Sequence, residues 1–570
     1  MAEDSFEQRS IPPATLSVLE LPLEILVVIF AIVDTLDCWG PLGAAYGRGI
    51  AKLMLVCRYW RDVAYATPEF WRRIDAAEPL DRVSLLLERS GGCTIDVRIF
   101  YPWIRKYQPL CHEAIALILP HAHRIRSLCI NLHLDHYPAV YELLERDMPA
   151  LEHLDLVPIR DLRSKGQYDR NYATCSLSRL KYPRLRSLVS QRLHVPHPMG
   201  FWRTLHTLKM YDFPRTASGE YLMRDVIAVL RANGGLEELV LWWYSGAPTA
   251  LPPNHQESRL PQASERQLFA LRNLGLLSLH GTYPCVKELL YHLLIPEDIP
   301  YVDIRVSISS EYTDVYEITQ IFGTLIPTHL RFLQERMSNV SFTGPAGTDC
   351  YTCCTPPYTH ADLERAPERT AIAFNQYPGI PVPQSVSLGV RCLVGVLGYT
   401  TVRCLSLAGP PPPAEDDCYE RMFDAFPSLE ELEVSGTNLM IRPDLFTALS
   451  PAPRADGGRE VPRCPHLRVL VVHCARMPRR WTGPQLLELV EAIGGCALAR
   501  AESDVRLHKV VLHFWISAVT AALDSEEPEQ VEEQEMGLRE PLQRLCGFVD
   551  VAEHDFSHGA AVCARCTSGY

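Results

Sequence analysis

The segment Leu151-Glu152-His153-Leu154-Asp155-Leu156 decides the fold, because its apolar-x-x-apolar-x-apolar spacing returns along most of the chain. Clear copies lie at residues 125–130, 236–241, 274–279, 402–407, 429–434, 467–472 and 507–512, and weaker ones at 185–188, 205–210, 301–306, around Val97 and around Val549. The copies follow one another at intervals of about 32 residues. A repeat of this length, with one short strand and one helix per unit, predicts an α/β array that grows along its length.

One interval breaks the period. No copy of the motif lies between Ile304 and Leu405, and this gap is close to three repeat lengths. We therefore expect two degenerate repeats inside it, with strands at Ser338–Phe342 and Thr370–Phe374. Glycine pairs at 91–92, 234–235 and 494–495 follow predicted helices, and we interpret them as left-handed helix ends.

These repeats resemble the leucine-rich-repeat horseshoe, and the resemblance covers most of residues 80–555. It implies a solenoid with a parallel concave sheet and outer helices. In each strand of such a solenoid the leucines point inward, and the residues between them line the concave face. We therefore expect a protein substrate to contact these alternating positions: Lys209, Tyr211, Glu238, Trp242, His280, Arg305, His473 and His513.

Trp242, Trp243 and Tyr244 form the most suggestive cluster on this expected face. Exposed aromatic side chains on a rigid sheet are typical of recognition hot spots. The alternative is that Trp242 or Trp243 packs under the next loop, and the sequence leaves both interpretations open.

Composition limits the class of function. The chain has 570 residues and a net charge of −13, which argues against a nucleic-acid-binding protein that relies on phosphate attraction. Its 45 prolines outnumber its 32 glycines and predict many interrupted segments. Segments rich in Pro and Gly, which we interpret as loops leaving the array, lie at residues 248–264, 343–369, 409–418 and 450–464.

Residues 18–75 differ from the repeats. Pro22 and Glu24 begin a first, almost wholly apolar helix, because proline and a carboxylate both suit the first helical turn. We expect a second helix from Lys52 to Tyr65, with Leu53, Val56, Trp60, Val63 and Ala64 on one face, and a short third helix that begins at Thr67. Three short helices make a thin core, which often means that a partner completes it.

Three blocks of this module, residues 21–26, 55–61 and 68–71, resemble the F-box motif, in particular the F-box proteins of mushroom-forming fungi. The connection at residues 38–49 is longer than in a minimal F-box. The resemblance implies docking to a Skp-family adaptor and, through it, to a cullin–RING ubiquitin ligase. The residues that it assigns to adaptor contact or to the motif core are Leu21, Pro22, Ile25, Leu26, Val56, Trp60 and Trp71.

Motifs for chemistry are weak. The sequence holds no GxSxG, HExxH, Walker A or GxGxxG motif, so we expect no catalytic residues, no cofactor and no bound metal. A structural zinc site usually takes two CxxC pairs as its four ligands. Cys350, Cys353 and Cys354 could supply one pair, and the far-off Cys563 and Cys566 form a second CxxC. We favour the interpretation that these cysteines are core or surface thiols. An enzyme that uses a hidden reactive cysteine is a third class of function.

Nineteen scattered cysteines and an acidic, polar N-terminus favour a protein of the cytoplasm or nucleus that is neither secreted nor bound to a membrane. We expect a disordered tail at 1–17, an F-box at 18–75, the repeats at 76–555 and a C-terminal tail at 556–570. The sequence thus predicts a non-catalytic substrate-recognition subunit of a ubiquitin ligase. The alternative is a leucine-rich-repeat scaffold without ligase coupling, in which the helical module only caps the array.

Overall fold

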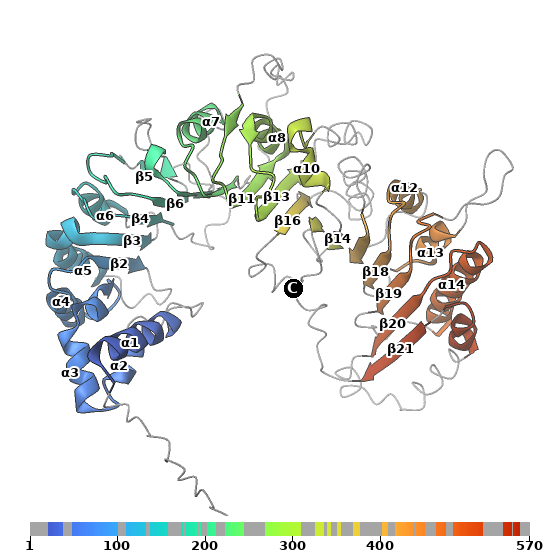
Figure 1. Ribbon diagram of the computed structural model, residues 1–570, viewed down its shortest axis with the longest axis horizontal. Helices are drawn as coiled ribbons and strands as arrows, with labels where there is room; N and C mark the ends of the chain where they lie inside the picture. The colour runs from blue at the N-terminus through green and yellow to red at the C-terminus, as the bar shows by residue number, and fades with distance from the viewer. Residues whose placement is uncertain are drawn as a thin grey trace, which may run out of the picture. The chain divides into compact units, whose positions relative to one another are not determined.

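The computed structural model describes a mixed α/β chain of alternating strands and helices (Figure 1). The residues that it describes are 21–37, 48–100, 110–132, 137–157, 173–174, 177–191, 193–194, 202–211, 223–243, 268–308, 325–335, 339–343, 350–354, 369–376, 402–408, 417–436, 441–450, 463–474, 483–516, 540–549 and 551–558. Both predicted tails, the motif residue Tyr244 and the Cys563–Cys566 pair lie outside them, except that residues 556–558 are part of the last strand. Within these ranges no helix is long and apolar enough to cross a bilayer.

The chain divides into two compact units, residues 1–205 and 206–570, and the division falls inside the predicted repeat region. The first unit begins with the helical module. Its elements are α1 (Leu23–Asp37), α2 (Arg48–Leu53), α3 (Arg58–Ala66) and the 3-10 helix η2 (Pro68–Trp71). Leu26 and Phe30 of α1 form its core with Ile50, Leu53, Val63 and Ala64.

The predicted second helix is wrong as a continuous element. It is two helices, because the chain turns at residues 54–57. Cys57 has an extended backbone (φ −156°, ψ 170°), and its Sγ accepts a hydrogen bond from the backbone N–H of Trp60 at 3.4 Å, which caps α3. The turn carries Val56 out of the face predicted for it, so Val56 is exposed while Val63 and Ala64 are buried.

A parallel ladder follows the helical module in the first unit. The strands β1, β2, β3, β4 and β6 pair in that order, each parallel to the next. Their bounds are β1 (Arg73–Asp75), β2 (Ile95–Phe100), β3 (Ile125–Asn131), β4 (His153–Leu156) and β6 (Ser187–Gln191). The other elements are α4 (Leu80–Arg89), α5 (Leu110–Ile118), η4 (Leu119–Arg124), α6 (Tyr137–Leu144), β5 (Ala173–Thr174), β7 (Leu193–His194) and η6 (Trp202–Thr204). Because β1 lies within residues 18–75, the end of the predicted F-box is already part of the sheet.

The second unit contains two parallel runs of strands. The first run is β8 (Thr207–Tyr211), β9 (Glu238–Trp242), β11 (Leu276–Thr282) and β13 (Tyr301–Ile308). The second run is β17 (Cys404–Ala408), β18 (Glu431–Gly436), β19 (Val469–Cys474), β20 (Lys509–Ile516) and β21 (Val551–His558). The other elements are α7 (Met223–Ala232), β10 (Phe269–Ala270), α8 (Tyr283–His292), β12 (Leu293–Leu294), η8 (Thr328–Leu330), α10 (Arg331–Glu335), α12 (Cys418–Ala425), α13 (Pro443–Leu449) and α14 (Gly483–Glu502).

The two hidden strands exist, but their order in the sheet differs from their order in the chain. They are β14 (Asn339–Thr343) and β16 (Arg369–Gln376), with β15 (Cys350–Cys354) between them. β16 pairs parallel with β13, β14 pairs parallel with β17, and β15 pairs antiparallel with both. The loop predicted for 343–369 is therefore wrong at residues 350–354, because a local antiparallel meander recruits this segment into the sheet.

Strand residues alternate between a buried face and a face that carries no described helix. In each unit the helices that alternate with the strands lie on one side of them, whereas α1, α2 and α3 lie at the end of the sheet (Figure 1). Leu239, Leu241, Leu277 and Leu279 point to the helical side and are buried, and the residues between them point the other way. We call this second side the helix-free face.

The repeat motif locates the strands well but not the register of every one. Val302, rather than Ile304, pairs with Leu277, and this shift of two residues leaves the same side chains on the helix-free face. The strand predicted around Val549 begins two residues later, at Val551, so Val549 itself lies outside it.

The three glycine pairs behave differently. Gly91 has φ +52° and ends α4 in the left-handed conformation, as predicted. Gly234 follows α7 without a positive φ. Gly494 and Gly495 lie inside α14, where the prediction of a helix end is wrong. Burial of Ile493, Cys496 and Ala497 offsets the low helix propensity of the two glycines.

Two buried arginines, one in each compact unit, link a helical segment to the segment before it. Arg500 of α14 is fully buried and donates to the carbonyls of Arg463 and Cys464 at 2.9 Å, and to those of Leu449 and Leu467 at 3.4 Å. Arg124 donates in the same way to the carbonyls of Leu87, Gly91 and Cys93, at the end of α4 and just beyond it. Leu87 lies in the last turn of α4 and Leu449 is the last residue of α13, whereas the other acceptors lie beyond these helices. The guanidinium groups thus satisfy carbonyls that have no partner within a helix.

Replacing Arg500 by Ala should lower the local free energy of unfolding of α14 by about 3 kcal/mol, because several buried carbonyls lose their donor. Hydrogen exchange of the α14 amides measures this change. Arg506→Ala is the matched control, since Arg506 also donates to two carbonyls, those of Gly547 and Phe548, but at an exposed position. Equal effects of the two substitutions would contradict the role of burial.

Candidate protein-binding surfaces

The helical module leaves much of its apolar surface exposed. Eight of the fourteen exposed large hydrophobic side chains of the described residues lie between Leu23 and Tyr65: Leu23, Ile25, Val28, Ile32, Leu55, Val56, Tyr59 and Tyr65. Within α1, Ile25, Val28 and Ile32 are three and four residues apart and therefore share one side of the helix. An exposed apolar stripe opposite a buried one is typical of a helix that packs on a partner.

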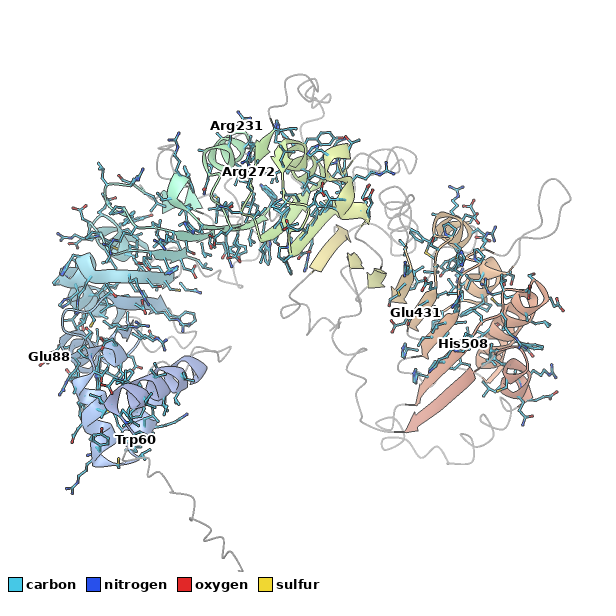
Figure 2. The ribbon with its side chains drawn as sticks, viewed as in Figure 1. Trp60, Glu88, Arg231, Arg272, Glu431 and His508 are labelled. Carbon is cyan, nitrogen blue, oxygen red and sulfur yellow. The ribbon has the colours of Figure 1, made fainter. Side chains whose placement is uncertain are left out.

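The seven residues predicted to bind an adaptor separate into two groups. Pro22, Ile25 and Val56 are exposed, with Ile25 at 48% and Val56 at 60%. The other four are Leu21, Leu26, Trp60 and Trp71. Leu21 and Trp60 (Figure 2) are half-buried and pack on the core, and Leu26 is fully buried. Leu21, Trp60 and Leu26 therefore contribute to the stability of the module, and their part in adaptor binding stays a prediction.

Trp71 joins α3 to α4. It is buried, and its Nε1–H donates to the carbonyl of Ala64 at 2.8 Å. Its ring stacks on Tyr65 with centroids 5.6 Å apart, and the guanidinium of Arg89 lies 4.7 Å from the centre of the Tyr65 ring. Trp71 is therefore an internal connection between α3 and α4 rather than a contact surface.

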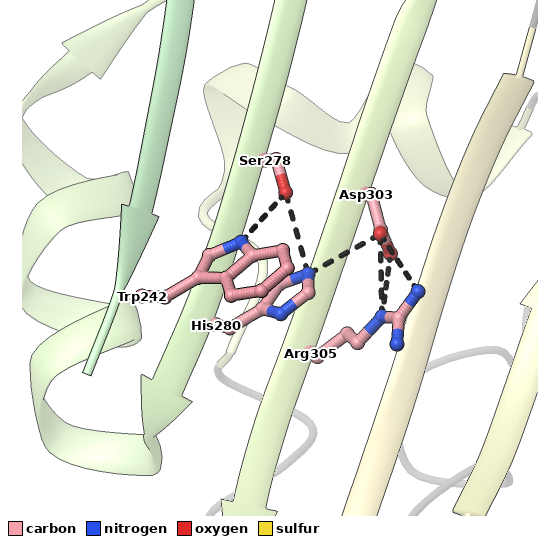
Figure 3. A network of polar contacts seen from close by, with 5 residues as sticks. All are labelled: Trp242, Ser278, His280, Asp303 and Arg305. Atoms are coloured by element: carbon pink, nitrogen blue, oxygen red, sulfur yellow. Dashed lines mark hydrogen bonds and ion pairs between the residues drawn. The ribbon is translucent and has the colours of Figure 1, made fainter. Parts of the chain in front are cut away.

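The second unit brings predicted face residues together on β9, β11 and β13 (Figure 3). Trp242 stacks on His280 with ring centroids 4.3 Å apart, and its Nε1–H donates to Ser278 Oγ at 3.3 Å. His280 Nε2 lies 3.2 Å from Asp303 Oδ2, and Arg305 Nη2 lies 3.1 Å from the same oxygen. These contacts form one connected network across three strands.

The neighbouring strand β8 extends this network. The rings of Tyr211 and Trp242 meet edge to face with centroids 4.9 Å apart. Lys209 Nζ lies 2.7 Å from Glu238 Oε1. Six of the eight predicted face residues therefore lie in one region of four adjacent strands, because the register places them at neighbouring positions.

His473 and His513 lie apart from that region, on β19 and β20. Their rings stack with centroids 4.7 Å apart, and His473 Nε2 lies 3.2 Å from Glu433 Oε1. The distance fits an ion pair, but the contact is poorly directed for a hydrogen bond. This group is a second polar cluster on the helix-free face.

Ser278, Asp303 and Glu433 were not selected as binding residues from the sequence, although their strand positions place them on the helix-free face. Asp303 joins His280 to Arg305, and Ser278 joins Trp242 to His280. Strand alternation predicts the side on which these residues lie, whereas their partners come from the next strand and depend on register.

The two adjacent tryptophans have different roles. Trp242 is half-exposed on the helix-free face, whereas Trp243 is buried on the helical side. Trp243 lies directly against Gly281 of β11, where an added Cβ would be 2.6 Å from its Cε3. Gly281 thus provides the space that Trp243 occupies. Trp243 is buried against a strand rather than under a loop, and the recognition role of the half-exposed Trp242 stays a prediction.

Several described thiols are poorly suited to nucleophilic chemistry. Burial, together with the negative charge of Asp155, raises the pKa of the Cys129 thiol to about 12. Burial likewise raises the pKa of Cys464 to about 12 and that of Cys496 to about 11. Among the described side chains, no three His, Cys, Asp or Glu residues are grouped so as to hold a metal ion.

We expect iodoacetamide at pH 8 to alkylate Cys129 and Cys464 at least about 100-fold more slowly than the exposed Cys546, because the thiolate is the reactive form. Time-resolved labelling of the native protein with peptide mapping measures the rates. If Cys129 were alkylated as fast as Cys546, the result would support the hypothesis of an enzyme with a reactive cysteine.

Gly281→Ala should destabilise the protein by about 1–3 kcal/mol, because the new methyl group overlaps Trp243. Thermal unfolding and the near-ultraviolet circular dichroism of tryptophan report the change. Gly275→Ala is the matched control, since its Cβ would lie at an ordinary 3.7 Å from the nearest heavy atom, the carbonyl oxygen of Glu237. If both variants melt like the wild type, the close packing of Trp243 on Gly281 is wrong.

Comparison with known proteins identifies the helical module. No curated protein shows significant similarity to the chain. Residues 18–77 match the sequence model of the family described as F-box-like, which covers α1, α2, α3, η2 and β1. F-box domains generally bind Skp-type adaptors of ubiquitin ligases. The chain therefore carries an F-box-like domain at its N-terminal end, followed by a mixed α/β region with a large parallel sheet.

Proposed function

We propose that the protein is a non-catalytic substrate-recognition subunit of a Skp/cullin/F-box ubiquitin ligase. The F-box-like domain docks a Skp-family adaptor, and through it a cullin. The remaining chain is a leucine-rich-repeat solenoid whose helix-free face binds a protein substrate. The observation that carries the proposal is the concentration of exposed apolar side chains between Leu23 and Tyr65, within the F-box-like match.

The energetics of that surface favour a bound partner. Apolar area removed from water contributes about 25 cal/mol per Å², so covering several half-exposed Ile, Leu and Val side chains supplies a substantial part of a binding free energy. Ile25, Val28 and Ile32 lie one turn apart and suit a helix-in-groove contact. The exposed Leu55 and Val56, at the turn between α2 and α3, are further candidate anchors.

The repeat region supports the second half of the proposal. Its helix-free face carries tryptophan, tyrosine and arginine side chains in one connected network, the residue types enriched at protein-binding hot spots. Cations and carboxylates alternate there, as in Lys209 with Glu238 and Arg305 with Asp303, which suits a protein better than a polyanion.

A scaffold without ligase coupling remains the second candidate function. It is favoured by the way the module joins the array, because η2 leads directly into β1, which pairs with β2. A module that only caps the first repeat would use the same connection. The two functions make different demands on the exposed α1 side chains. The ligase function requires them to contact an adaptor, whereas the scaffold function does not.

The Ile25→Asp, Val56→Asp double variant should weaken capture of a purified Skp-family adaptor at least ten-fold, about 1.4 kcal/mol, because two exposed apolar contacts become charged. Biolayer interferometry on the full-length chain measures the affinity. Both positions are exposed, so the variant should keep the unfolding temperature of the wild type.

Leu180→Asp is the matched control, since Leu180 is 92% exposed and lies outside the F-box-like domain. It should bind the adaptor like the wild type. Failure of the wild type to bind any Skp-family adaptor, or full binding by the double variant, would reject ligase coupling and leave the scaffold function.

A further inference from the structure

Four side chains form a line across the helix-free face of the second unit. Tyr211 pairs in register with Trp242, Trp242 with His280, and His280 with Arg305. These residues come from the neighbouring parallel strands β8, β9, β11 and β13. We call them the aromatic–arginine row. Figure 3 shows three of its members, with Ser278 and Asp303 in the adjacent row of positions.

Trp242 is held in place within this row. His280 covers one face of its indole at 4.3 Å with an interplanar angle of 7°, and Tyr211, from the strand on the opposite side, contacts it at an angle of 81°. Its Nε1–H is bonded to Ser278 Oγ. Because His280 stacks on one face of the indole and Tyr211 contacts it from the neighbouring strand, the indole is fixed in orientation. It is a rigid apolar anchor that loses little conformational entropy on binding.

The acidic side chain of the network is more deeply buried than the basic ones. The carboxylate of Asp303 is only 4% exposed, whereas the side chain of Arg305 is 30% exposed and that of His280 is 16% exposed. Arg305 turns Nε and Nη2 toward Asp303, at 3.2 and 3.1 Å from Oδ2. A partner that approaches the face therefore meets the guanidinium before the carboxylate, and the buried carboxylate orients the guanidinium.

A planar guanidinium with five N–H donors recognises carboxylates by paired hydrogen bonds. A guanidinium has more N–H donors than one carboxylate uses, so its chemistry allows Arg305 to bind a second carboxylate while it keeps Asp303. Lys209 is less suited to this role, since Glu238 is as exposed as Lys209 and lies 2.7 Å from it. The cationic end of the row is thus Arg305, and the apolar end is Trp242 with Tyr211.

We infer that the aromatic–arginine row is a binding site for an exposed polypeptide segment in which a carboxylate lies close to an apolar side chain. The carboxylate pairs with Arg305, and the apolar side chain packs on the edge of Trp242 and on Tyr211. His280 lies on the strand between the two contacts, so Trp242 and Arg305 are two strand spacings apart, about 9.6 Å. Residues three apart in an extended segment span this distance, and residues two apart do so with the reach of their side chains. The inference rests on the proposed function and names the substrate class of its repeat face.

The test is selection of a phage-displayed random peptide library on the full-length protein. Enriched sequences should carry Asp or Glu two or three residues from a large apolar side chain. The affinity of a synthesised enriched peptide, measured by fluorescence anisotropy, should fall at least ten-fold for Arg305→Gln and for Trp242→Ala. It should fall ten-fold as well when the Asp or Glu of the peptide is replaced by Asn or Gln.

Arg403→Gln is the matched control, because Arg403 is an exposed arginine of the same unit, close to Glu430 and outside the row. It should bind the peptide like the wild type. Arg305→Lys keeps the charge but lacks the planar fork, and it should bind with intermediate affinity. Unfolding temperatures of all variants separate lost contacts from lost folding.

Three results would overturn the inference: no peptide enriched above background, enriched peptides without acidic residues, or equal binding by Arg305→Gln. Adaptor capture measured on the same preparations keeps this test distinct from that of the proposed function. A protein that selects acidic–apolar peptides but captures no adaptor would retain this site and lose the ligase role.

Discussion

The register between neighbouring parallel strands is the constraint on which the rest of this structure depends. Each strand buries every second residue under the helices, so a shift by one position would expose the leucines and bury the polar residues between them. In-register pairs such as Leu239 with Leu277 keep both faces intact from strand to strand. The same pairing brings Trp242 beside His280 and His280 beside Arg305. Core stability and the arrangement of the helix-free face are therefore consequences of one alignment.

The ends of the repeats need a second kind of interaction. Carbonyl groups at a helix end, and in the loop beyond it, have no partner within the helix. Arg124 and Arg500 donate to such carbonyls from buried positions. At these two places a side chain of one helical segment is thus bonded to the segment before it, in addition to the pairing of the strands. In contrast, the F-box-like domain leaves the apolar stripe of α1 exposed at the beginning of the chain.

Local pattern predicted much of the array. The apolar spacing located most strands of the large sheet, and the length of the one gap in the spacing indicated β14 and β16. Errors occurred where the outcome depended on more distant partners. β15 became a strand because β14 and β16 flank it, and the helix around residues 52–65 broke because the Cys57 side chain caps a new one. Gly494 and Gly495 stayed helical because the residues that follow them are buried.

The sequence by itself determined the repeat period, the alternation of the two sheet faces and the F-box-like character of residues 18–77, because each of these is encoded by residues close together in the chain. Only the tertiary structure decided which side chains meet across strands, and hence that Ser278 and Asp303 hold Trp242, His280 and Arg305 in one network. It also placed β16 rather than β14 beside β13. Strand pairing joins residues far apart in sequence, and a pattern of period two does not specify the partner of a strand.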